Sequence, residues 1–356
     1  MVRQVSAVKG SIAAAVFALL VASAAAPAAA NPCTPVAYPI FGKYVASGTL
    51  HGPGLLLDGG GAMEAPNASL QWAHNLLAGT TGVTPRFGNI VVLRAFDANI
   101  YDKMFYQYGL FSSVQTIRIP PCAPDAAIDA LVPLIDRADA VYFAGGDQAH
   151  YVRWKTTQLV AAIRRVYARG GLVGGGSAGL AVQGAVVFDS VAGDKLDEVV
   201  TTLNAVKYPF EKSISFTTDF FAWPALANTI TDTHFVVRDR FGRTVVFIAR
   251  IVHDALLPNV ANVYGLGIDQ ASSVGVGPDG FATVFNAPGG KGAFLVRGTS
   301  PDPLANRGPI DYTVQVSHVA RNGERFDLLH KKTSDGWKRI TVDGAHVPFY
   351  SSDPYK

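Results

Sequence analysis

A serine among small residues is the feature of this sequence whose residue types most directly suggest chemistry. Ser177 lies in the run GGGSAG at 174–179, which follows the apolar pair Leu172-Val173. This pattern is typical of a sharp turn from a buried strand into a helix, where small neighbours leave a nucleophilic hydroxyl exposed. The N–H of Ala178 can then face a developing oxyanion. A tight turn without catalytic function is the alternative, because the chain contains 36 glycines.

Two other blocks accompany this serine. Residues 141–148 read VYFAGGDQ and suggest a strand, a glycine turn and a helix start, and residues 232–243 read DTHFVVRDRFGR. The three blocks, in this order, resemble cyanophycinase and its relatives in the serine peptidase family that also holds aspartyl dipeptidase E. The resemblance extends from Leu55 to Val276, with DGGG at 58–61 and GLGID at 265–269 as lesser landmarks.

The resemblance implies a hydrolase of cyanophycin, a poly-aspartate whose side chains carry arginine through isopeptide bonds. It implies that Ser177 is the nucleophile and that His234 is its base, followed by water attack on an acyl-enzyme and release of β-Asp-Arg dipeptides. The backbone N–H groups of Gly146 and Ala178 are the candidates for the oxyanion hole. Arginines can hold substrate carboxylates, and an aspartate or a glutamine can receive guanidinium or amino groups. The residues implied for these substrate contacts are Gln148, Asp232, Arg240 and Arg243.

The third member of the expected triad departs from the family. The position that carries a glutamate in the relatives is Gln270 here. A neutral amide oxygen can accept a hydrogen bond from the imidazole, but it cannot stabilise the imidazolium that forms in the transition state. Asp269 could substitute only through a bulge or turn, because successive strand residues point to opposite faces. Another carboxylate from a loop is a further option.

Histidine is the usual base for a serine nucleophile because its pKa lies near neutrality. His234 is the candidate among eight histidines, since it lies in the matching block and follows the serine. A weaker reading is an esterase of the α/β-hydrolase type that uses a histidine near the C-terminus, such as His318. Two other readings are a peptidase for other acidic or isoaspartyl peptides and a binding protein that has lost turnover.

The N-terminus has the composition of a secretory signal peptide. Arg3 and Lys9 precede an uncharged run rich in Ala, Val and Leu, and alanines at 28–30 form a cleavage site before Asn31. We therefore expect a secreted protein, extracellular or periplasmic, with no membrane anchor after cleavage. In an oxidising compartment Cys33 and Cys122 can form a disulfide, and two unpaired thiols are the alternative.

Composition narrows the function further. Without residues 1–30 the chain is close to neutral, so the sequence indicates no general polyanion-binding surface and no nucleic-acid partner. The mechanism requires no metal and no organic cofactor. A homodimer is suggested by family analogy alone.

Short apolar strands alternate with helical patterns between residues 54 and 184. Strands are predicted at 55–57, 90–93, 116–119, 141–143 and 172–173, and helices at 64–78, 124–138 and 149–168. This alternation favours an α/β fold with a mostly parallel sheet and helices on both faces, flavodoxin-like or class I glutamine amidotransferase-like. A helix at 244–257 precedes short alternating strands. We expect a signal peptide at 1–30, a catalytic domain at 31–297 and a β-rich C-terminal extension packed on it at 298–356.

Overall fold

The computed structural model describes residues 31–61, 67–82, 85–96, 100–192, 200–299 and 302–356. The predicted signal peptide lies outside these residues. Within the described segments, no helix has both the length and the apolar character needed to cross a membrane.

A first sheet has a parallel centre, as the alternation of strands and helices predicts. Its order is β1-β5-β4-β6-β7-β3-β12-β13-β16, and β2 also pairs with β5. The strands β5, β4, β6, β7 and β3 are parallel. Strands β1 and β2 pair antiparallel with β5, and β12, β13 and β16 extend the other edge through successive antiparallel pairs. The bounds of the strands in this sheet are β1 Val36–Ala37, β2 Phe41–Gly42, β3 Gly54–Asp58, β4 Asn89–Arg94, β5 Ser113–Arg118, β6 Ala140–Phe143, β7 Leu172–Gly176, β12 Ser272–Val276, β13 Phe281–Asn286 and β16 Arg325–Asp327.

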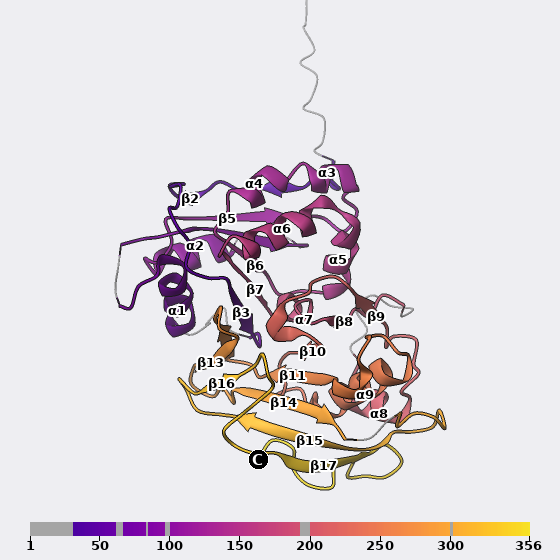
Figure 1. Cartoon of the computed structure of the whole chain (residues 1–356). Helices are drawn as coiled ribbons and strands as arrows, with labels where there is room; N and C mark the ends of the chain where they lie inside the picture. The colour runs from indigo at the N-terminus through magenta and orange to yellow at the C-terminus, as the bar shows by residue number, and fades with distance from the viewer. Residues whose placement is uncertain (1–30, 62–66, 83–84, 97–99, 193–199, 300–301) are drawn as a thin grey trace, which may run out of the picture. The chain divides into compact units, whose positions relative to one another are not determined.

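Successive side chains of β3 enter two separate cores, because side chains alternate between the faces of a strand. Leu55 and Leu57 pack in the core that also holds residues of α3, α4 and α6, whereas Leu56 packs with residues of α1 and α2. The sheet is therefore covered on both faces, as predicted (Figure 1). The helices around it are α1 Asn67–Ala78, α2 Ile100–Gln107, α3 Asp125–Asp129, α4 Val132–Asp136, α5 Gln148–Val152, the 3-10 turn η1 Arg153–Thr156, α6 Gln158–Ala168 and α7 Ala178–Ala181.

Two of the predicted helices are interrupted in the structure. The pattern at 124–138 forms α3 and α4, with Pro133 in the first turn of the second helix, where a missing N–H is tolerated. The pattern at 149–168 forms α5, η1 and α6. The chain becomes extended at Thr157, and the Thr157 hydroxyl donates to the carbonyl of Trp154. Apolar spacing continues across both breaks, which is why the sequence pattern alone does not reveal them.

The structure contains a second sheet that the sequence analysis did not separate from the first. Its order is β17-β15-β14-β11-β10-β8-β9, and β8, β10 and β11 are parallel. Helix α9, Phe241–His253, packs on this sheet through its apolar face. The other elements here are β8 Val186–Phe188, α8 Thr202–Lys207, β9 Phe216–Thr218, η2 Pro224–Leu226, β10 Thr229–Asp232, η3 Val260–Asn262, β11 Tyr264–Ile268, β14 Ala293–Gly298, β15 Asp311–Val319 and β17 Lys338–Asp343.

Residues 302–356 contribute strands to both sheets. Strand β15 lies between β14 and β17 in the second sheet, whereas β16 pairs with β13 in the first. Near the other end of the described chain, Cys33 and Cys122 are joined by a disulfide. This bond ties the segment before β1 to the turn after β5.

Candidate active site

Ser177 occupies the turn between β7 and α7. Its φ of 53° and ψ of −116° are unusual for a residue with a side chain, and such strain is often retained at functional sites. The turn requires very close backbone approach, because a Cβ on Gly179 would lie 2.1 Å from the carbonyl oxygen of Phe143. The small residues around Ser177 therefore permit the strained turn, as the sequence pattern predicts.

His234 faces this serine from the second sheet, two residues after β10 ends. The Oγ of Ser177 lies 2.9 Å from Nε2 of His234. On the other side of the ring, Nδ1 lies 3.1 Å from Oε1 of Gln270. His318 lies on β15, where its ring stacks on Phe294 and Nε2 contacts the carbonyl of Lys291. The structure thus brings Ser177, His234 and Gln270 together and leaves His318 elsewhere.

The hydrogen bonds of His234 suit a neutral ring. With its proton on Nδ1, the imidazole donates to Gln270 Oε1, and Nε2 accepts the hydroxyl of Ser177. Burial lowers the pKa of His234 to about 4, and the charges of Arg238 and Arg240 act in the same direction, against the bond to Gln270. His234 is therefore an unprotonated base at neutral pH, but its protonated form receives little stabilisation.

Asp269 does not take the place of the missing glutamate. Strand β11 ends at Ile268, and Oδ1 of Asp269 accepts hydrogen bonds from the N–H groups of Val236 and Val237 at 2.8 and 3.1 Å. The carboxylate thus holds the backbone that follows His234 and leaves the ring to Gln270. Asp269 therefore does not orient His234 in place of the glutamate, because the ring contacts Gln270 instead.

The two expected oxyanion donors lie in one pocket with Ser177. Gly146 follows β6 and Ala178 begins α7, and both residues line the pocket beside Ser177. Within the described part of the chain, neither backbone N–H has a hydrogen-bond partner. Both groups are thus available to an oxyanion formed at Ser177.

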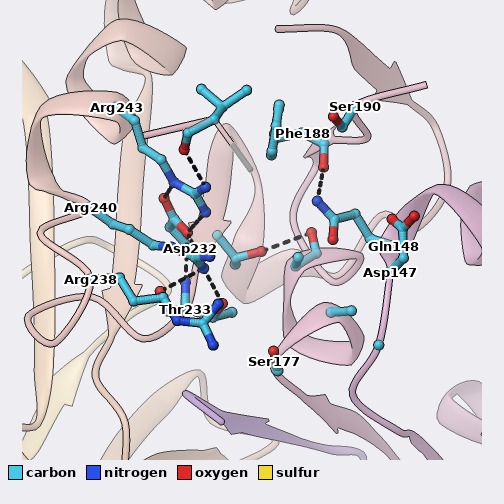
Figure 2. A pocket seen from close by; sticks show the side chains of 15 residues that line it. Asp147, Gln148, Ser177, Phe188, Ser190, Asp232, Thr233, Arg238, Arg240 and Arg243 are labelled. Atoms are coloured by element: carbon cyan, nitrogen blue, oxygen red, sulfur yellow. Dashed lines mark hydrogen bonds and ion pairs between the residues drawn. The ribbon is translucent and has the colours of Figure 1, made fainter. Parts of the chain in front are cut away.

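This pocket extends away from Ser177 between the ends of the two sheets. It encloses about 190 Å³, less than the roughly 300 Å³ at which pockets for whole small-molecule ligands begin. In Figure 2, Gln148 and Asp147 lie on one side, and Asp232 with the arginines lies on the other. The substrate-contact residues expected from the sequence all line it: Gln148, Asp232, Arg240 and Arg243.

Asp232 and Arg243 are already engaged with each other. Arg243 donates through Nε and Nη2 to the two oxygens of Asp232, and its Nη1 donates to the carbonyl of Val200. Thr244 Oγ1 also donates to Asp232. Burial acts to raise the pKa of Asp232, but the charges of Arg243 and Arg240 outweigh it and lower the pKa. From the sequence, Asp232 is expected to receive a substrate guanidinium or amino group, whereas in the structure it binds the guanidinium of Arg243.

Arg238 is a pocket residue that is not among the substrate contacts expected from the sequence. Its side chain lines the pocket, and within the described residues it makes no ion pair or hydrogen bond. Ser190 and Phe188 also line the pocket and were not expected. The spacing of the arginines at 238 and 240 is a weak sequence signal that Arg238 belongs to the pocket. No pattern near Ser190 in the sequence indicates that this serine lines the pocket.

Two tyrosines from the C-terminal segment support the arginine-bearing turn. The hydroxyls of Tyr350 and Tyr355 both donate to Oδ1 of Asp239, at 2.8 and 2.7 Å. The same hydroxyls accept the N–H groups of Gly242 and Phe241 in the first turn of α9. A segment in which the sequence showed no chemical motif therefore anchors one wall of the pocket.

Comparison with known proteins agrees with this site. Residues 99–210, which include Ser177, match the model of peptidase family S51. Among solved structures, the chain is similar to a peptidase from an acI-B1 Actinobacterium, with 17% identity, a TM-score of 0.44 and coverage of 79% of this chain and 98% of that chain. A candidate peptidase E protein from Listeria monocytogenes EGD-e follows, with 12% identity, a TM-score of 0.40 and coverage of 66% and 98%. Among curated proteins, none matches the sequence significantly.

The matched region contains part of the candidate active site. The region supplies the Ser177 turn and the pocket residues Gly146 and Gln148, and the following segment supplies the histidine that contacts Ser177. Over residues 99–210 this chain matches peptidase family S51, and this match supports a serine-type peptidase similar to cyanophycinase and peptidase E.

Proposed function

We propose that this chain is a secreted exopeptidase that degrades cyanophycin to β-Asp-Arg dipeptides. The observation that carries the proposal is the contact of His234 with Ser177, which lines a pocket that also contains three arginines.

The mechanism follows from the hydrogen bonds at Ser177. Its Oγ attacks the backbone carbonyl of the polymer while Nε2 of His234 takes the hydroxyl proton. The N–H groups of Gly146 and Ala178 stabilise the oxyanion of the tetrahedral intermediate. His234 then gives its proton to the leaving amine, which leaves an ester on Ser177. Water, deprotonated by His234, attacks this ester and releases the dipeptide.

The charges of the pocket suit a substrate that carries carboxylate groups. Asp232 forms paired bonds with Arg243 and lies 3.4 Å from Nη1 of Arg240. Arg240 also donates through Nη1 to the carbonyl and hydroxyl of Thr233, and the side chain of Arg238 lies at the pocket without a partner among the described residues. Guanidinium groups bind carboxylates in two-point fashion, so these two arginines are the proposed carboxylate ligands.

The opposite side of the pocket is the proposed location of the substrate's arginine side chain. Gln148 donates through Nε2 to the carbonyl of Phe188, which leaves Oε1 as its acceptor. Ser190, whose Oγ is buried without a hydrogen-bond partner among the described residues, lies beside it and offers a second acceptor. An aspartate unit that carries arginine presents a carboxylate and a guanidinium group. The carboxylate suits the side of the pocket with the arginines, and the guanidinium suits the side with Gln148 and Ser190.

Secretion is supported by the sequence of residues 1–30 and by the bond between Cys33 and Cys122. Disulfides persist mainly in oxidising compartments. A secreted enzyme of this type would act on polymer released by other cells.

Gln270 favours a second candidate, a protein that binds the polymer or isoaspartyl peptides with weak turnover. A neutral amide at this position gives no charge to offset the protonated His234. The same pocket residues would then serve binding alone.

One experiment separates these functions. The mature protein is incubated with cyanophycin, and soluble β-Asp-Arg is measured by mass spectrometry, with isoaspartyl dipeptides as competing substrates. We expect dipeptide release by the wild type, and a loss of several orders of magnitude in Ser177→Ala. Retained binding of the polymer by Ser177→Ala serves as its folding control. Binding without release by the wild type would favour the second candidate, and release by Ser177→Ala would refute the serine mechanism.

A further inference from the structure

The glycine-rich segment Asp58–Gly61 has no part in the chemistry described so far. It begins at the end of β3, which is the neighbour of β7 in the first sheet. The catalytic residues come from three different strand ends: Ser177 follows β7 in the first sheet, whereas His234 and Gln270 follow β10 and β11 in the second. The two sheets must therefore be held in a fixed relation if the three side chains are to meet.

Three successive carbonyls of this segment bind the three catalytic segments. The N–H of Ser177 donates to the carbonyl of Asp58 at 3.0 Å, and the N–H of His234 donates to the carbonyl of Gly59 at 2.8 Å. The N–H of Ala271, which directly follows Gln270, donates to the carbonyl of Gly60 at 3.2 Å. A single short stretch of backbone thus forms hydrogen bonds with Ser177, with His234 and with the residue that follows Gln270.

The segment is also in side-chain contact with the triad, and this contact demands glycine. Gly60 has a φ of +92°, and a Cβ there would lie 2.7 Å from Nε2 of His234 and 2.8 Å from Cβ of Ser177. A Cβ on Gly61 would lie 2.2 Å from Cδ of Gln270. Backbone in the left-handed region at consecutive positions is costly to hold unless another group fixes it.

The carboxyl group of Asp58 supplies that fixation. Its Oδ1 accepts the N–H of Gly60 at 2.9 Å, which closes the turn between the first and third residues of the segment. The Oδ2 lies 3.4 Å from the hydroxyl of Tyr142. We propose that Asp58 is a positioning residue for catalysis, which holds the Asp58–Gly61 backbone as the common template for Ser177, His234 and Gln270.

This role needs an acceptor oxygen and no charge. Burial raises the pKa of Asp58 to about 7, against the hydrogen bonds from Gly60 and Tyr142. A carboxyl group keeps an acceptor oxygen for Gly60 whether or not it is ionised. An asparagine at position 58 offers the same oxygen at the same place, whereas an alanine offers none.

The test measures the reactivity of Ser177 toward a fluorophosphonate probe. Because the inference rests on the proposed serine mechanism, the probe is chosen so that no natural substrate is needed. In the reaction, Ser177 Oγ displaces fluoride from phosphorus and His234 takes the hydroxyl proton. The variants are Asp58→Ala and Asp58→Asn, with Asp139→Ala as a matched control. Asp139 is similarly buried and accepts the N–H of Asn89 before β6 begins, away from the pocket residues.

We expect Asp58→Ala to slow labelling at least about tenfold, since small misplacements of reacting groups are this costly. With peptide substrate, kcat should fall while KM stays near the wild-type value. Asp58→Asn should label within about threefold of the wild type, and Asp139→Ala should label normally even if it melts earlier. Should Asp58→Ala fail to fold, Asp58→Leu fills the site without an acceptor and carries the same expectation.

Three results would overturn the assignment. Wild-type labelling rates in Asp58→Ala or Asp58→Leu would make Asp58 a purely structural residue. Equal losses in Asp58→Asn and Asp58→Ala would show that the acceptor is not what matters. Failure of the wild type to label at Ser177 would remove the proposed function itself, and the positioning role with it.

Discussion

Two buried carboxyl groups flank the catalytic residues, and they differ in what surrounds them. Asp58 ends β3 and Asp232 ends β10, and each is 2% exposed. Asp58 is bonded to the N–H of Gly60 and lies beside the hydroxyl of Tyr142, and burial raises its pKa to about 7. At Asp232 burial acts in the same direction, but the charges of Arg243 and Arg240 more than offset it, so the pKa is lowered.

Two carboxyl groups that are equally buried thus have different chemical roles. Asp58 acts as a hydrogen-bond acceptor that fixes glycine backbone on the serine side of the site. Asp232 acts as an anion that organises arginines on the substrate side. A buried carboxylate is stable as an anion only where cations and hydrogen bonds replace the water it has lost.

The largest expected effect comes from breaking the charged pair. Arg243→Ala leaves Asp232 buried without its principal partner, which should lower the free energy of unfolding by about 3 to 5 kcal/mol. Urea denaturation measures this loss. This differs from the expectation, drawn from the sequence, that Arg243 contacts the substrate.

A double variant provides the control for that loss. Asp232→Leu combined with Arg243→Met replaces the pair by apolar groups of similar volume, and we expect it to recover most of the stability without recovering activity. A single Arg243→Ala variant as stable as the wild type would show that the two buried carboxylates do not differ as described.

A smaller effect tests the raised pKa of Asp58. In the unfolded chain this group ionises near 3.8, and in the folded protein near 7. Between these pH values only the unfolded state loses the proton, so stability from this group is present below about pH 4 and is lost as the pH rises toward 7. Asp58→Asn removes this dependence, and its stability relative to the wild type should be higher at pH 8 than at pH 4 by roughly 3 kcal/mol or less. Denaturation curves at pH 4 and pH 8 measure this difference. The same change in stability between the two pH values in the wild type and in Asp58→Asn would contradict the prediction.

Arg238, in contrast to Arg243, has a side chain that forms no ion pair with a described residue. Because its side chain faces the pocket and is exposed, Arg238→Ala should raise KM for cyanophycin by about tenfold or more, with an unchanged melting temperature. Steady-state kinetics and a thermal melt check both parts. Arg165→Ala, which removes an exposed arginine paired with Asp136, is the matched control. An unchanged KM would reduce Arg238 to a surface residue.

Gln270→Glu adds a single negative charge beside His234, and we expect the smallest effect from it. We expect turnover to rise at least about tenfold, equivalent to roughly 1.4 kcal/mol of barrier, because the carboxylate stabilises the protonated ring. The pKa of His234, about 4 with Gln270, should rise, so the acidic limb of the pH profile of kcat/KM should move to higher pH. An equally fast variant with an unmoved limb would mean that Gln270 does not limit the wild type.

The sequence alone determined the local features of this protein. The serine turn, the alternation of strands and helices before residue 184, and His234 as the partner of Ser177 could all be predicted. Each depends on short-range backbone geometry, on apolar periodicity or on a motif within a few residues. The breaks at Pro133 and Thr157 were missed because apolar spacing runs across them.

Only the tertiary structure decided how the charged groups are used. Arg243 neutralises Asp232, and Asp269 accepts backbone N–H groups after His234. Tyr350 and Tyr355 support the turn that carries the arginines. These contacts join segments that are apart in the sequence. The division into two sheets, and the template at Asp58–Gly61 that joins them, belong to the same class. The energy of a buried charge or hydrogen bond depends on its partners in space, and a single sequence records residue types without those partners.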